Sequence, residues 1–120
     1  MSQTLNGRAP YTVTPHTAGA TLTGNDNGTM HSNAGATGAI VLALPPATPG
    51  LHFYFHVMAA QELRIDPNLL QTIGLPSTGV QGGAGKYLTA DAIGEWVHLV
   101  CVAAGAWTVQ GFAGTWTAEA

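Results

Sequence analysis

Short runs of alternating apolar and polar residues fill the second half of the chain. In residues 51–57 the odd positions are apolar, with Phe53 and Phe55 at the centre, and the even positions hold His52, Tyr54 and His56. Successive side chains of a β-strand point to opposite faces of a sheet, so this run predicts a strand with one buried face. We therefore expect both phenylalanines in the core, and Leu99 and Val109 with them.

Similar but shorter patterns predict further strands, which are interrupted by proline and glycine. They cover residues 39–44, 62–66, 86–89, 95–103 and 106–112. The last two are expected to form a hairpin through the turn Ala104–Gly105. Residues 95–103 are apolar on both faces, so the face with Trp96 and His98 needs a second cover, which another subunit can supply.

The fold class follows from the spacing of these strands. No stretch of ten or more residues has the pattern of an amphipathic helix, and turn residues recur at fairly even intervals. The sequence thus predicts an all-β protein with a single small β-sandwich or jelly-roll-like domain over residues 20–117. Residues 118–120 are read as a C-terminal tail, and no internal repeat is visible.

Residues 1–19 have a different composition, rich in threonine and interrupted by Pro10 and Pro15, and show no sustained period. Proline removes a backbone donor and disfavours regular structure. We interpret this segment as an extended N-terminal arm that can contact a partner; the alternative is a tail without contacts. The expected contact residues of the arm are Leu5, Arg8, Tyr11 and Val13.

Charge is sparse. Only 8% of the 120 residues are charged, against roughly 25% in an ordinary soluble domain. This deficit favours a surface covered by other chains, although an uncharged surface rich in Thr, Asn and Gln is the alternative. The chain has three basic residues and a net charge of −3, too little cationic surface for a nucleic acid or an anionic membrane.

No arrangement of reactive residues indicates an enzyme, a metal site or a cofactor. His52 and His56 are four positions apart on a strand, too far to share one ion unless a trimer axis brings copies of one histidine together. His16 and His31 are expected in polar loops and carry no motif. The six acidic residues form no recognisable pair. Cys101 cannot form an intrachain disulfide because it is the only cysteine, and its apolar setting predicts a small buried side chain.

The aromatic residues allow two interpretations. Trp96, Trp107 and Trp116 could form a platform for a sugar, or they could fill the core and an oligomer interface, which is the commoner use. On the second interpretation, an oligomer interface is expected at outward positions of the strands 51–57 and 95–103: His52, Tyr54, His56, Trp96 and His98.

The order of these landmarks resembles a β-sandwich domain that recurs in the virion proteins of tailed bacteriophages. The resemblance covers roughly residues 20–117 and rests on Leu44-Pro45, Gly50, Phe53, Phe55, Ile65, Ile73-Gly74, Leu88, Val97, Leu99, Trp107, Val109 and the closing Gly114-Thr115-Trp116. It implies a homotrimeric virion component without enzymatic activity.

Within that family, the short chain and the lack of a fibre shaft favour a head-decoration (cement) protein. Such a protein would be assembled in the host cytoplasm, bind the major capsid protein on the exterior of the capsid and stabilise the lattice. The alternative is a receptor- or carbohydrate-binding tip of a tail fibre.

Overall fold

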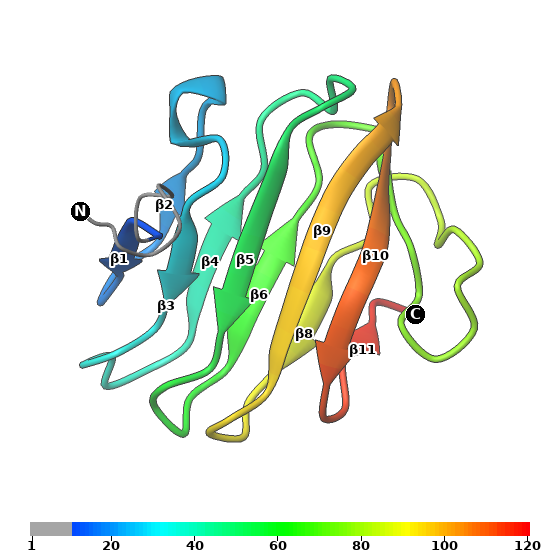
Figure 1. The fold of residues 1–120 in the computed structure, drawn as a ribbon. Coiled ribbons are helices and arrows are strands. Elements are labelled where there is room, and N and C mark those ends of the chain that lie inside the picture. The colour runs from blue at the N-terminus through cyan, green and yellow to red at the C-terminus, as the bar shows by residue number, and fades with distance from the viewer. Residues whose placement is uncertain (1–10) are drawn as a thin grey trace, which may run out of the picture.

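The computed structural model describes residues 11–120, which form two β-sheets packed face to face (Figure 1). The six-stranded sheet A contains, in spatial order, β1 (Val13–Pro15), β3 (Met30–Ser32), β5 (His52–His56), β9 (Trp96–Ala103), β10 (Ala106–Ala113) and β7 (Thr72–Ile73). The five-stranded sheet B contains β11 (Thr117–Ala118), β8 (Leu88–Ala90), β6 (Leu63–Asp66), β4 (Ile40–Ala43) and β2 (Ala20–Thr21). The predicted all-β sandwich is confirmed.

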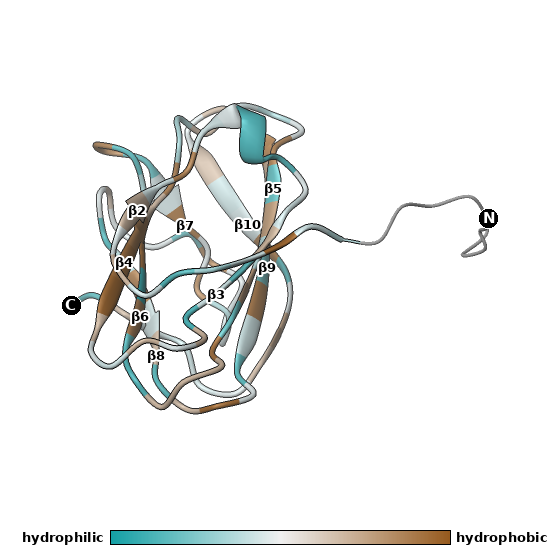
Figure 2. Ribbon diagram, turned by 90° about the vertical axis from the view of Figure 1, so that its left-hand side faces the viewer, coloured by the Kyte–Doolittle hydropathy of each residue, from teal (hydrophilic) through white to brown (hydrophobic). Residues whose placement is uncertain are grey.

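The first six strands alternate between the two sheets and wind as three stacked turns (Figures 1 and 2). In sheet A, β1, β3 and β5 are parallel, and in sheet B, β2, β4 and β6 are parallel. Ala20 pairs with Leu42, and Ile40 with Leu63, so one turn takes 22 or 23 residues in sheet B. A jelly roll is built from antiparallel strand pairs. The six strands β1 to β6 pair in parallel within each sheet, so this half of the domain is connected differently from a jelly roll.

The remaining strands close the sandwich mainly by antiparallel pairing. β9 pairs with β5, β10 pairs with β9 through the predicted hairpin, and β8 pairs with β6. Apart from the single 3₁₀ turn η1 (Gly24–Asp26), residues 11–120 contain no helix, and hence none that is long and apolar enough to cross a membrane.

The core lies between the sheets and is made of the inward residues of each strand. Phe53, Phe55, Leu99 and Trp107 are fully buried, which confirms the predicted phase of residues 51–57 and 95–103. Val109, the fourth expected core residue, is half-buried and packs against the core from the side. A buried aromatic side chain removes a large apolar area from water, so Phe53, Phe55 and Trp107 each stabilise the domain.

A buried asparagine joins the second and third turns. Asn33, which is 0% exposed, donates from Nδ2 to the carbonyl oxygens of Ala59 and Gln61, each at 3.1 Å. Its Oδ1 accepts from the backbone N–H groups of Met58 at 2.7 Å and Ala59 at 2.9 Å. Both amide donors and both acceptor positions are therefore used, and the corner after β3 is fixed to the corner after β5.

Paired strands begin inside the segment that we interpreted as the arm. Residues 13–15 form β1, which pairs with β3 of the same chain as the edge strand of sheet A. At the other end, Thr117–Ala118 forms β11 on sheet B, so the last strand extends one residue into the expected tail. Two of the expected arm contacts, Leu5 and Arg8, lie outside the described residues.

A chain of hydrogen bonds fastens β1 to the sandwich. His16 Nε2 and His31 Nδ1 are 2.9 Å apart, and His31 Nε2 is 2.6 Å from the Thr29 hydroxyl. That hydroxyl donates to the Asp26 carbonyl at 2.5 Å, so His31 Nε2 must donate to Thr29 and His31 Nδ1 must accept from His16. Our interpretation of His31 as a loop residue is wrong: it lies in β3, only 2% exposed, between Phe53 and Phe55.

Candidate functional site: an uncharged aromatic face on sheet A

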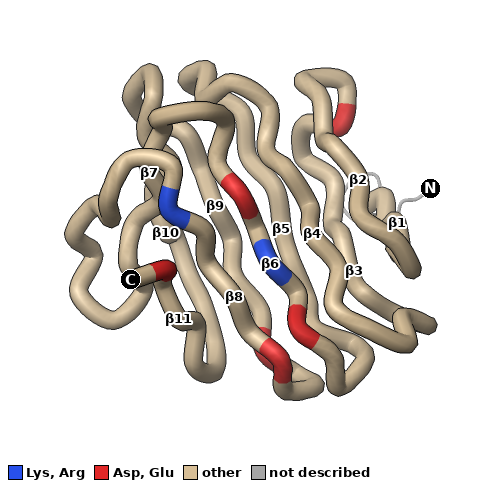
Figure 3. The backbone as a smooth tube through the Cα atoms, turned by 180° about the vertical axis from the view of Figure 1, so that it is seen from behind, with Lys and Arg blue, Asp and Glu red and all other residues tan. Residues whose placement is uncertain are grey.

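The outward face of sheet A carries no formal charge. None of its six strands contains Asp, Glu, Lys or Arg. Apart from Asp26 of η1 and Glu95 directly before β9, the charged residues of the described part of the chain lie on or beside β6, β8 and β11 of sheet B (Figure 3). The sandwich therefore presents two faces of different chemistry, and the uncharged one is the larger sheet.

Cross-strand pairing brings the expected interface residues of β5 and β9 together. Tyr54 lies opposite His98, and their rings stack with centroids 3.8 Å apart and planes 11° from parallel. The imidazole of His52 reaches the same point, with its Nδ1 3.1 Å from His98 Nε2. Tyr11 closes the cluster from the N-terminal side, because its hydroxyl is 3.1 Å from that of Tyr54.

A second stacked pair lies two residues further along the same strands. His56 lies opposite Trp96, with ring centroids 6.1 Å apart and planes 19° from parallel. Gly111 of β10 makes room for the indole, since a Cβ there would come within 3.1 Å of its outer edge. We call this surface the aromatic face; its residues are Tyr11, His52, Tyr54, His56, Trp96 and His98.

An apolar groove of about 330 Å³ continues the aromatic face toward the edge strand β1. Its floor and walls come from three neighbouring strands and the loops that follow them: Val13, Pro15, Met30, Ser32, Ala34, His56 and Met58. Val13 is 57% exposed and Met58 is 53% exposed. Val13 belongs to the edge strand β1 and Met58 to the loop after β5. Exposed apolar side chains that gather in this way are typical of contact sites.

Three ionisable side chains of the aromatic face stay neutral near pH 7 because their pKa values are shifted. Burial lowers the pKa of His56, and burial together with the neighbouring His52 lowers the pKa of His98. The pKa of the Tyr54 hydroxyl is raised, first by its hydrogen bond with Tyr11 and then by burial. The face therefore gains no charge from these three residues at neutral pH, which lowers the cost of removing it from water.

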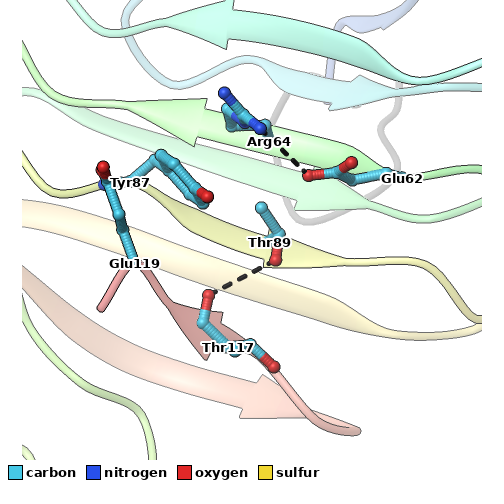
Figure 4. A network of polar contacts seen from close by, with 6 residues as sticks. All are labelled: Glu62, Arg64, Tyr87, Thr89, Thr117 and Glu119. Atoms are coloured by element: carbon cyan, nitrogen blue, oxygen red, sulfur yellow. Dashed lines mark hydrogen bonds and ion pairs between the residues drawn. The ribbon is translucent and has the colours of Figure 1, made fainter.

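The outward face of sheet B is polar by contrast (Figure 4). Arg64 lies over the ring of Tyr87, 3.9 Å from its centroid, and pairs with Glu62 at 3.6 Å. Thr89 donates to the carbonyl of Thr117 across β8 and β11. Exposed ion pairs of this kind contribute little to stability but keep a surface hydrated, so this face is suited to contact with solvent.

A polar hollow of about 210 Å³ next to sheet B is lined by three acidic residues, Glu62, Asp91 and Glu95. Glu95 accepts backbone N–H bonds from Asp91, Ala92 and Thr115 at 3.2, 2.9 and 2.7 Å. Burial raises the pKa of Glu95, but the three donors outweigh it and the net pKa is lowered. This carboxylate therefore acts as a brace between two loops.

Other candidate reactive groups are held apart. Cys101 is 1% exposed, points into the core, and has a pKa raised by burial, whereas His98 points outward on the same strand. Trp107 and Trp116 are buried and only Trp96 is on the aromatic face, so the three tryptophans form no common platform. Within residues 11–120, no three His, Cys, Asp or Glu side chains are placed to hold one metal ion.

Comparison of the chain with models of known protein families, with curated protein sequences and with solved structures finds no match.

The expected interface residues all lie on the aromatic face. Of the expected arm contacts, Tyr11 belongs to this face and Val13 lines the adjoining groove. The sequence pattern indicated neither the groove residues Met30 and Met58 nor the hydrogen-bonded pair His52 and His98. The alternation of residues 51–57 and 95–103 places both histidines on outward positions. It does not say which strands are neighbours, and hence it does not bring the two together.

Proposed function

We propose that the protein is a structural, non-enzymatic assembly protein whose copies associate through the aromatic face of sheet A. The observation that carries this proposal is the complete lack of Asp, Glu, Lys and Arg from the six strands of this sheet. Stacked aromatic rings and an apolar groove occupy the outward positions instead. Interface cores are enriched in Tyr, Trp and Met and depleted in charge, as this face is.

The resemblance to virion domains of tailed bacteriophages makes the proposal more specific. In this form, three copies assemble and decorate the exterior of a phage head, where they bind the major capsid protein. A ligand that binds only the assembled lattice stabilises it by mass action. The charged side of sheet B (Figure 3) would then face solvent, which agrees with its ion pair and its polar hollow.

Counting copies of the chain in purified virions tests this role. Quantitative mass spectrometry should find the chain in a fixed ratio to the major capsid protein, as expected for a component spread over the lattice. A handful of copies per particle would contradict head decoration and favour the tail-fibre tip. Absence from virions would contradict both.

The receptor- or carbohydrate-binding alternative depends on the same face, because the half-exposed Trp96 ring stacked on His56 could also stack on a sugar. Binding to a glycan array separates the two functions. An assembly protein gives no saturable glycan signal, whereas a receptor-binding tip gives one that is lost on Trp96→Ala.

A further inference from the structure

The pair His52 and His98 has the geometry of a metal chelate. Its two facing nitrogens, Nδ1 of His52 and Nε2 of His98, are 3.1 Å apart. Bonds of about 2.0–2.1 Å from one zinc ion to two imidazole nitrogens span this distance at an N–Zn–N angle of about 100°. That angle is close to tetrahedral, so both rings can bind one ion after a small rotation.

The surroundings hold both rings in place. The ring of Tyr54 stacks on His98 and lies edge-on to the ring of His52, with centroids 6.0 Å apart, and the backbone N–H of His52 donates to the Asn27 side chain at 2.8 Å. Both histidines are on paired strands of sheet A, which gives the site a rigid base. No lysine or arginine is present in these strands to repel a cation.

The other histidine pair of the described residues lacks these properties. His31 is 2% exposed, and its second ring nitrogen is already bonded to Thr29. His52 and His98 are both half-exposed, and within residues 11–120 their facing nitrogens bond only to each other. An ion from solvent can therefore reach the facing nitrogens of His52 and His98, but not those of His16 and His31.

We propose that His52 and His98 form a two-histidine site for a divalent transition ion of the zinc, nickel and copper group, the ions that imidazole prefers. The proton shared between the rings moves to the outer nitrogen of its own ring, so both histidines remain neutral ligands. The remaining positions on the ion are filled by water. If copies associate through the aromatic face, as proposed above, side chains of a neighbouring copy can replace part of that water.

Calorimetric titration of the full-length, tag-free protein with zinc chloride at pH 7.5 tests the site. We expect saturable binding that weakens at least about tenfold in His98→Gln and in His52→Gln. His56→Gln is the matched control, because His56 is on the same face without a histidine partner, and it should bind as the original chain does. Lack of saturable binding, or equal weakening in all three variants, would overturn the proposal.

Electron paramagnetic resonance with Cu²⁺ supplies a readout that does not depend on affinity. Coupling to two imidazole nitrogens is expected in the original chain and to one in His98→Gln; the same spectrum in both would overturn the site. The mass of the zinc-loaded protein separates the two proposals. One ion per chain in a monomer supports the metal site and contradicts self-association. An oligomer that binds no zinc supports self-association and contradicts the metal site.

Discussion

Tyr54 lies flat on His98 across the β5–β9 pair, with ring centroids 3.8 Å apart and planes 11° from parallel. This contact marks the centre of the aromatic face. The inward neighbours of the two residues, Phe53, Phe55, Val97 and Leu99, are completely buried. The same two strands therefore build the core with one face and the candidate association surface with the other.

Truncating an inward-facing core side chain of β5 should strongly lower the free energy of unfolding. Phe55 is 0% exposed, and Phe→Ala in a packed core costs about 3–5 kcal/mol. Urea denaturation of Phe55→Ala should show this loss, whereas the control Phe112→Ala, at a position 42% exposed on β10, should cost much less. Equal losses in the two variants would contradict the register of β5.

Asn33 should be the most sensitive polar residue of the fold. Asn33→Ala leaves four backbone groups of the neighbouring turn without their partner, and we expect a loss of about 2–4 kcal/mol in the free energy of unfolding. Asn33→Asp keeps the oxygen that accepts the two backbone N–H bonds but loses both N–H donors, and it should also destabilise the fold. Asn25→Ala, at an exposed position of η1, is the control and should change the midpoint little.

Stability should fall between pH 6.5 and pH 4 because of His31. Burial, together with the neighbouring His16, lowers the pKa of His31 from 6.5 to about 4, against an opposing effect of Asp26. In this window the unfolded chain binds a proton that the folded chain does not, so the free energy of unfolding decreases as the pH falls. The effect is at most about 3 kcal/mol, since one pKa unit is worth about 1.4 kcal/mol.

The measurement compares urea unfolding of the original chain and of His31→Gln at pH 7, 6, 5 and 4.5. The variant removes this titration but leaves the carboxylates, so its stability should depend less on pH. Parallel curves would show that His31 does not control the acid sensitivity.

Hydrophobic alternation predicted the part of the fold in which strands are long and one face is apolar. It located residues 51–57 and 95–103 and the hairpin at Gly105, and the structure agrees within one or two residues at each end. It missed β2 and β3, which are two and three residues long and lie among Thr, Asn and Gly. Nor did it reveal the three stacked turns, because Asn33 and backbone bonds at the corners hold them together, and such bonds leave no hydrophobic period.

The candidate site was likewise predicted only in part. Outward positions of single strands were found from the period of two, but contacts between strands depend on register, which the sequence pattern does not fix. The pairing of His31 with His16 shows the same limit, because a histidine in a polar stretch became a buried residue once the β1–β3 pair had formed.

The central claim is that the aromatic face of sheet A joins copies of the chain. Two valines allow a matched test, since Val100 is on the outward face of β9 opposite His52, and Val41 is on the outward face of β4 in sheet B. A lysine placed at either position adds one charge to a solvent-facing strand, but only Val100→Lys places it in the proposed interface, where burying an unpaired charge is costly.

Sedimentation equilibrium gives the mass of the original chain, Val100→Lys and Val41→Lys in solution, and so tests this claim directly. We expect the original chain and Val41→Lys to reach three times the monomer mass, and Val100→Lys to remain monomeric with an unchanged circular dichroism spectrum. A monomeric original chain at micromolar concentration, or a trimer that Val100→Lys leaves intact, would contradict it.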